Sequence, residues 1–185
     1  MEISGWEEKY RSGERGKEEA PTILVVEAAK TVVPGTAIDL ACGAGRNALY
    51  LAERGWHVTA VDGSQAAIDL LRVRSAMLGL QVQTAVADLT QPSFMMPPDA
   101  FDLIVIAYYL QRDLFAKAKA AARPGGVILA IVHTPETGEK WTDKRAVPGE
   151  LRGFFTGWEI LHDYEGASRD PAHRRPVAEI LARRK

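Results

Sequence analysis

The sequence predicts an α/β fold, in which a mostly parallel β-sheet carries helices on both faces. Short apolar runs of strand length alternate with segments of helical periodicity through the middle of the chain. A glycine-containing turn follows the first run, and acidic residues stand at the ends of the first three. Alternating strands and helices imply right-handed crossovers, so the strands are parallel and their carboxyl ends share one edge. With 185 residues, we expect a single domain over residues 1–185.

Composition narrows the class of protein. The formal net charge of −1 provides no basic field for nucleic acid or anionic lipid. Cys42 is the single cysteine, which excludes an internal disulfide and a cysteine metal cluster, and we expect no metal site. No apolar segment is long enough to span a membrane. We therefore expect a cytoplasmic protein, monomeric or homodimeric, without a membrane or nucleic-acid partner.

The first 20 residues are polar, yet they include Trp6, Tyr10 and Arg11. Aromatic side chains in a polar arm need a surface to pack on, which leaves two interpretations. Residues 1–20 are either a loose arm that an aromatic side chain pins to the body, or a lid over a ligand site. A helix is expected next, over Pro21–Lys30, because proline suits a first helical turn and the following residues continue a helical pattern.

Three strands and two helices follow in alternation. The first strand, Thr36–Leu40, leads into the glycine turn and then into a helix whose apolar residues share one face. Gly55 suits the C-terminus of that helix, and strand His57–Val61 comes after it. Ser64 can cap a second helix, which precedes strand Val82–Val86.

The second half of the chain supplies two more parallel strands and a terminal hairpin. Strand Phe101–Ile106 is apolar enough to be buried on both faces. A helix over Gln111–Ala122 and a proline–glycine turn precede strand Val127–Val132. Two further strand-like runs, Trp158–Tyr164 and Val177–Ala182, are joined by a segment too short and polar for a helix. They predict a hairpin at the edge of the sheet.

The acids at the strand ends indicate the ligand. Asp39, Asp62 and Asp88 lie within or just beyond the carboxyl ends of the first three strands, where open α/β sheets bind ligands. An acid after the second strand can accept hydrogen bonds from ribose hydroxyls, and one after the third can accept from an adenine amino group. Asp39, beside the glycine turn, can meet an ammonium group. A single Asp often only caps a turn, but the three together predict S-adenosylmethionine as cofactor.

The same residues resemble the motifs of the class I S-adenosylmethionine-dependent methyltransferases. Ile38–Gly45 resembles the first motif, Val61–Ser64 the second and Ala87–Leu89 the third. Phe101–Ile104 and the turn Arg123–Gly126 resemble the strand-four motif and the turn before strand five. The motifs are specific together, and the match covers residues 36–132.

The resemblance implies a Rossmann-like α/β/α sandwich with a cofactor-binding core at residues 36–132. The expected sheet has seven strands in the order 3-2-1-4-5-7-6, with an antiparallel last strand in a hairpin at residues 156–185. Trp6, Tyr10 and the short length resemble the small tellurite-resistance-type branch. Ala41 departs from the pattern, since many members carry a third glycine there. The residues implied to hold the cofactor are Trp6, Tyr10, Arg11, Asp39, Ala41, Gly43, Gly45, Asn47, Asp62, Gly63, Ser64, Asp88, Leu89 and Ala107.

The resemblance also implies where the methyl acceptor binds, because the family places it after strand four. Tyr108 and Tyr109 stand there and can orient an acceptor, with ordinary aromatic packing as the alternative. His133 ends strand five and is a candidate base. We expect the polar segment from Thr134 to Gly149 to close over the site together with the N-terminal arm, since long connections are often active-site covers.

Three classes of function remain open at this stage. The favoured one is methyl transfer by direct displacement to a small molecule, with a thiol or a chalcogen oxyanion among the acceptors. A NAD(P)-dependent oxidoreductase would also use an acid about 20 residues after Gly43, although no catalytic Tyr-x-x-x-Lys appears. A cofactor-binding regulator without catalysis would keep the same acids.

Overall fold

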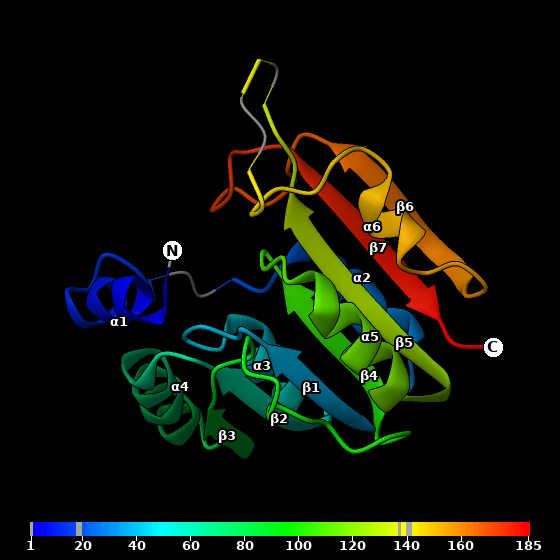
Figure 1. The fold of residues 1–185 in the computed structure, drawn as a ribbon. Coiled ribbons are helices and arrows are strands. Elements are labelled where there is room, and N and C mark those ends of the chain that lie inside the picture. Colours follow the sequence, from blue (N-terminus) through cyan, green and yellow to red (C-terminus); the bar gives the residue numbers. More distant parts are fainter. Residues whose placement is uncertain (1, 18–19, 137, 140–141) are drawn as a thin grey trace.

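One seven-stranded sheet forms the centre of the molecule, in the order β3-β2-β1-β4-β5-β7-β6 (Figure 1). The structure is a computed structural model that describes residues 2–17, 20–136, 138–139 and 142–185. β7 pairs antiparallel with β5 and β6, and the other adjacent strands pair in parallel. The predicted strand order and the antiparallel β7 are therefore confirmed.

The strands occupy nearly the predicted ranges. They are β1 (Thr36–Leu40), β2 (His57–Asp62), β3 (Val82–Val86), β4 (Phe101–Ala107), β5 (Ala122–His133), β6 (Glu159–Gly166) and β7 (Val177–Arg183). β5 differs most, because it begins at Ala122, which pairs with Phe101 ahead of a register shift between Phe101 and Leu103. The predicted turn at residues 123–126 is thus the irregular first part of β5.

Two of the helices were not predicted. The helices are α1 (Ile3–Arg11), α2 (Ile23–Thr31), α3 (Arg46–Glu53), α4 (Gln65–Leu78), α5 (Arg112–Ala121) and the short α6 (Glu150–Gly153). α1 carries no buried residue, so its apolar side chains do not enter the core. The N-terminal arm is helical over α1, where the sequence analysis expected either a loose arm or a lid.

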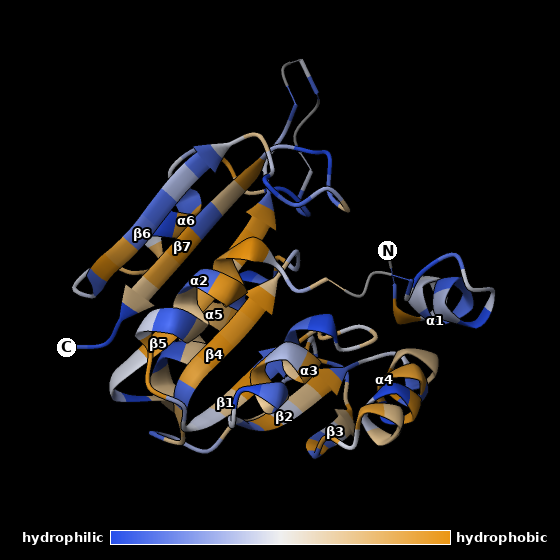
Figure 2. Ribbon diagram, turned by 180° about the vertical axis from the view of Figure 1, so that it is seen from behind, coloured by the Kyte–Doolittle hydropathy of each residue, from blue (hydrophilic) through white to orange (hydrophobic). Residues whose placement is uncertain are grey.

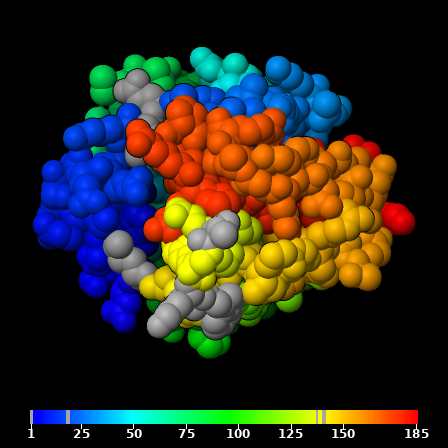
Figure 3. Space-filling view, turned by 90° about the horizontal axis from the view of Figure 1, so that it is seen from above, coloured from blue at the N-terminus to red at the C-terminus, as the bar shows by residue number. Residues whose placement is uncertain are grey.

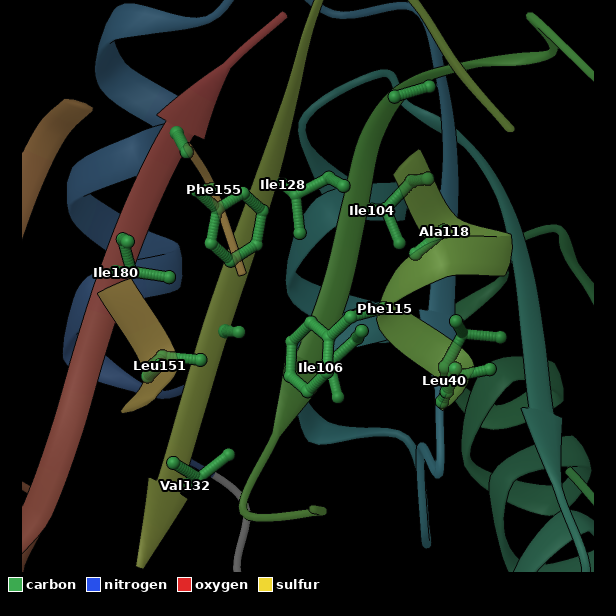
Figure 4. Close-up of a cluster of buried hydrophobic side chains, with 14 of the residues drawn as sticks. Leu40, Ile104, Ile106, Phe115, Ala118, Ile128, Val132, Leu151, Phe155 and Ile180 are labelled. Atoms are coloured by element: carbon green, nitrogen blue, oxygen red, sulfur yellow. The ribbon is translucent and has the colours of Figure 1, made fainter. Parts of the chain in front are cut away.

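Alternate residues of the central strands face two different helical layers. In β4, Leu103 and Val105 belong to the cluster that includes α2, α3 and α4. Ile104 and Ile106 belong to the cluster that includes α5 and α6, where Phe115 of α5 packs beside Ile106 (Figure 4). β4 and β5 are largely apolar along their length (Figure 2), as strands buried on both faces require. The predicted three-layer sandwich is confirmed.

The parallel strands direct their carboxyl ends toward one edge of the sheet. Three segments from distant parts of the sequence gather at this edge in the view of Figure 3: α1, the connection after β5, and the connection between β6 and β7. Within the described ranges, none of the helices has the length and apolar character needed to cross a membrane.

We expect Phe115→Ala to destabilise the fold by about 3–5 kcal/mol, the usual loss for a deleted core phenylalanine. The Phe115 ring is 1% exposed, stacks on Phe154 at a centroid distance of 4.5 Å and meets the edge of Phe155 at 6.0 Å. Urea unfolding followed by circular dichroism measures the change. Val73→Ala, at a position 58% exposed on α4, is the control and should shift stability by less than about 0.5 kcal/mol. Equal effects of the two substitutions would contradict this assignment.

Candidate active site

A cavity of about 680 Å³ lies at the carboxyl ends of β1, β2 and β4. All of the residues predicted for the site line it, except Arg11 and His133. Those that do are Trp6, Tyr10, Asp39, Ala41, Gly43, Gly45, Asn47, Asp62, Gly63, Ser64, Asp88, Leu89, Ala107, Tyr108 and Tyr109. The fold therefore brings together residues that lie up to about a hundred positions apart in the sequence.

Asp39 is a buried acid in the wall of this cavity. Its side chain is 1% exposed, and its Oδ2 accepts no hydrogen bond from the described residues. Burial, together with the nearby Asp62 carboxylate, raises the pKa of Asp39 to about 7. A buried polar atom without a partner costs about 1–3 kcal/mol, so this oxygen is a candidate ligand contact.

Asp62 joins the two loops at the cavity. Its Oδ2 accepts the backbone N–H of Gly43 at 2.8 Å, and its Oδ1 accepts that of Ser64 at 2.9 Å. Burial raises the pKa of Asp62 despite these bonds. Each carboxylate oxygen has a second lone pair, so Asp62 can still accept hydrogen bonds from two ligand hydroxyls.

The turn after β1 owes its glycines to close packing. Gly43 and Gly45 have φ values of 55° and 81°, where only glycine is free of strain. A Cβ atom would overlap the Tyr10 hydroxyl at Gly43 and Leu71 at Gly45. Glycines in a ligand loop let a ligand approach the backbone, and here they also leave room for Tyr10 of α1 and Leu71 of α4. Ala41 also has a positive φ, 56°, a conformation that glycine adopts without strain.

Three predicted cofactor residues already use part of their side chains within the protein. Ser64 Oγ accepts the Ala67 N–H at 3.1 Å, which confirms Ser64 as the N-cap of α4. Asn47 Oδ1 accepts the backbone N–H of Thr22 at 2.9 Å. Asp88 Oδ1 accepts both the N–H of Thr90 at 2.9 Å and its hydroxyl at 2.6 Å. These acceptors keep further lone pairs, and the bonds orient them within the cavity wall.

Tyr109 is held at the same end of the cavity as Asp88. Its hydroxyl donates to Gln111 Oε1 at 2.7 Å, and the Gln111 amide donates to the carbonyl of Leu89 at 2.7 Å. Burial and the charge of Asp88 raise the pKa of Tyr109 to about 12. Tyr109 is therefore a neutral, anchored donor beside the third acid.

Tyr108 belongs to a second group of side chains, which the sequence did not predict. The ring stacks on His173 with a centroid distance of 3.4 Å and an interplanar angle of 1°. Its hydroxyl donates to Asp170 Oδ2 at 3.0 Å, and Arg46 Nη2 contacts the same oxygen at 2.7 Å. Tyr108 has a φ of 61°, a conformation that a non-glycine residue adopts only when its surroundings impose it. The group therefore fixes the wall of the cavity beside β4.

Two predicted site residues lie elsewhere. Arg11 pairs with Glu7 at 2.8 Å, and its side chain is 69% exposed, so it points out from α1 instead of into the cavity. His133 does not line the cavity but lies 5.4 Å from both the Tyr108 and His173 rings, centroid to centroid. Burial, followed by the charge of Arg145, lowers the pKa of His133, which weakens it as a base.

Several cavity residues escaped the sequence analysis. His173 was assigned to the hairpin, yet the connection between β6 and β7 folds back and places it in the cavity wall with Arg15, Arg46 and Lys144. The turn-rich composition of that connection gave no sign of this path. One available signal was Arg46 itself, since a charged residue at the start of a helix in a ligand loop needs a partner. That partner is Asp170, 124 positions away.

Comparisons with known proteins agree with this geometry. The sequence model for the tellurite resistance protein TehB matches residues 8–171. Hemagglutinin 1 of Eikenella corrodens is 33% identical over 152 residues, which are 76% of this chain and 49% of that protein. A probable S-adenosyl-L-methionine-dependent methyltransferase TehB of Haemophilus influenzae strain 10810 is 34% identical over 150 residues, 74% of this chain and 50% of that protein. The chain thus spans about half the length of these curated relatives.

A comparison of folds also matches this chain with TehB. The crystal structure of TehB from Haemophilus influenzae matches with a TM-score of 0.79 and 26% identity, over 97% of this chain and 67% of that one. The family model covers most of the chain, and the matched structure shares its architecture. The chain therefore belongs to the tellurite resistance protein TehB family, a branch of the class I S-adenosylmethionine-dependent methyltransferases.

Proposed function

We propose that this protein transfers a methyl group from S-adenosylmethionine to a small, soft acceptor of the thiol or chalcogen-oxyanion class. The buried Oδ2 atom of Asp39, which has no partner among the described residues, carries the proposal, because it lies in one cavity with Asp62 and Asp88. A ligand with an ammonium group, a ribose diol and an amino-purine matches these three acids in their order along the sheet edge.

The residues present fit this cofactor. An ammonium group would give the Asp39 oxygen the partner that the protein withholds, and the contact would offset the cost of burying a carboxylate. The ribose hydroxyls would find the remaining lone pairs of Asp62, and the purine amino group those of Asp88. When bound, S-adenosylmethionine supplies a methyl group on a positively charged sulfur that leaves readily. The protein's part is then to align the acceptor and exclude water.

The acceptor end of the cavity favours an atom that is nucleophilic without help from a base. Burial and the charge of Arg46 lower the pKa of His173 to about 4, so this imidazole is neutral at pH 7 and holds a proton poorly. Asp170 is occupied by Arg46 and Tyr108. Arg15 and Lys144 also line the cavity and bring positive charge. An anionic acceptor with a soft donor atom suits these surroundings, whereas a protonated amine does not.

Of the two alternative functions, the NAD(P)-dependent oxidoreductase is set aside, because S-adenosylmethionine is the cofactor named for the Haemophilus relative. A regulator that binds the cofactor without catalysis would keep the same acids. The two remaining functions differ in turnover, and a methyl-transfer assay separates them.

We expect a screen of acceptors to give S-adenosylhomocysteine with small thiols or chalcogen oxyanions and far less with primary amines. Product formation from S-adenosylmethionine is the measurement. Asp62→Ala is the matched control, because losing hydrogen bonds to a charged acceptor costs about 1.5–3 kcal/mol and should suppress turnover at low cofactor concentration. Cofactor binding without turnover of any acceptor would favour the regulator, and preference for amines would contradict the acceptor class.

Binding of S-adenosylhomocysteine should weaken as the pH falls through 7. The free protein holds Asp39 with a pKa of about 7, and the ligand ammonium requires the ionised carboxylate. Below that pH the affinity should approach a tenfold loss per pH unit, since a proton must be released on binding. Calorimetry from pH 8 to pH 6 measures the change. Asp39→Asn should bind weakly at all these pH values, whereas Asp69→Asn, at a side chain 58% exposed on α4, should behave as wild type. A flat wild-type profile would contradict the contact.

Three segments supply the rim of the cavity and form the proposed lid. α1 contributes Trp6 and Tyr10, the connection after β5 contributes Lys144, and the connection between β6 and β7 contributes His173. The predicted lid comprised the first two segments; of its residues, 1, 18–19, 137 and 140–141 lie outside the described ones. A lid of this size leaves an enclosed acceptor space, which suits a small molecule better than a protein or nucleic acid.

S-Adenosylhomocysteine should slow tryptic cleavage at the lid, because closure protects the backbone of its segments. We expect slower cuts between Arg11 and Lys17 and at Lys144 and Arg145. Cleavage at Arg54, in the turn between α3 and β2 at the far edge of the sheet, is the internal control and should not change. Equal cleavage rates at all of these sites with and without ligand would leave the proposed lid without support.

A further inference from the structure

We propose that Glu7 is the positioning residue that fastens α1 over the two cofactor loops. The inference rests on the proposed function of the cavity, and it adds a residue that the acid and glycine motifs do not include. Its basis is a set of contacts between one face of α1 and the loops that follow β1 and β2.

The docking face of α1 is formed by Ile3, Glu7 and Tyr10. Their spacings of four and three residues place them on one side of the helix. Tyr10 covers Gly43 and Ile3 covers Gly63, since a Cβ atom at either glycine would overlap these side chains. Because Gly43 and Gly63 have no side chains, the two cofactor loops leave room for α1. Glu7 lies between Ile3 and Tyr10 on the same side of the helix.

Glu7 caps a helix to which it does not belong. Its Oε2 accepts the Ser64 hydroxyl at 2.7 Å and the backbone N–H of Ala66 at 3.1 Å, both at the start of α4. A helix N-terminus carries unpaired N–H groups and partial positive charge, both of which a carboxylate satisfies. The bonds from Ala66 and Ser64 keep the pKa of Glu7 below its usual value, so the carboxylate stays charged at neutral pH.

The same contact reaches the site of the ribose. Ser64, which donates its hydroxyl to Glu7, also donates its backbone N–H to Asp62 Oδ1 at 2.9 Å. Asp62 in turn holds Gly43. A chain of three bonds thus runs from Glu7 through Ser64 and Asp62 to the glycine turn, so the position of α1 and the geometry of both loops depend on each other.

The other contacts of α1 lie at the surface. It contains no buried residue, and its apolar side chains Ile3 and Trp6 remain 38% and 37% exposed. A nine-residue helix is marginal by itself in water, and the chain that follows it is held at Gly16, whose carbonyl accepts a hydrogen bond from Arg74. A charged anchor at a defined position therefore adds to these contacts and fixes where α1 lies over the cavity.

The test replaces Glu7 in the full chain and measures S-adenosylhomocysteine binding by calorimetry. Glu7→Ala should weaken affinity about fivefold, the effect expected for removal of a helix cap. It should also raise the KM for S-adenosylmethionine more than it lowers kcat, and speed tryptic cleavage between Arg11 and Lys17. Glu7→Gln keeps an oxygen that can accept the Ala66 N–H, so it should recover part of the affinity. A purely structural role would not produce this split or this rescue.

Glu8→Ala is the matched control, because Glu8 is the next residue of the same helix, carries the same charge and is exposed. It should bind, turn over and cleave as wild type does. The proposal is overturned if both alanine variants bind S-adenosylhomocysteine like the wild type, or if both lose the same affinity, since the loss would then follow net charge or helix propensity. Wild-type protein that binds no S-adenosylhomocysteine would instead overturn the proposed function, so the two failures are distinguishable.

Discussion

The geometry of the site depends on one carboxylate, that of Asp62, which holds the loops after β1 and β2 together. Both loops are short and built from small residues, and the loop after β1 has left-handed backbone at Ala41, Gly43 and Gly45, so the loops have almost no apolar core of their own. The N–H bonds from Gly43 and Ser64 to Asp62 fix the distance between them. Burial raises the pKa of this carboxyl, and the charge-assisted bonds from the two loops, about twice as strong as neutral ones, offset part of that desolvation. In the proposed function, the loops after β1 and β2 are then already ordered before the cofactor binds, so its binding energy is not reduced by ordering them.

The cavity is polarised between two ends of opposite charge. Asp39, Asp62 and Asp88 stand along the strands on one side of the glycine turn, and Arg46 stands on the other side with His173 close by. In the proposed function, the acidic end receives the cationic cofactor and the basic end receives an anionic acceptor. The Arg46–Asp170 pair limits the basic end, because it neutralises the Arg46 guanidinium, which lies 5.6 Å from the centroid of the Tyr108 ring. The fields at the two ends therefore orient both reactants before any contact with the methyl group forms.

The features that could be predicted from the sequence are those encoded by contiguous residues: the apolar strands, the glycine turn and the acids at the strand ends. The parallel topology of the sheet then places these features together, independently of the connections elsewhere in the chain. α1 was not predicted because the contacts that hold it are tertiary, such as the bond from the Ala66 N–H of α4 to Glu7, and the helix has no buried residue. His173 and Asp170 were missed because a turn-rich connection has no periodicity from which its path can be predicted. His133 does not line the cavity, since a strand end indicates the correct edge of the sheet but not whether a side chain reaches the cavity.

The two halves of the site are therefore specified in different ways, which bears on how acceptor preference can vary. Changing a strand-end acid or a loop glycine disturbs the sheet edge itself, so the cofactor half tolerates little substitution. The acceptor half is assembled from Arg46, Tyr108 and the connection between β6 and β7, and that connection is held from outside as well, because Arg169 pairs with Glu27 at 2.8 Å and with Glu179 at 2.9 Å. Anchored at Arg169 and at Asp170, the residues between Asp170 and β7 can change without loosening the core. In the proposed function, acceptor specificity would accordingly reside in this connection, while the residues at the strand ends would hold the cofactor.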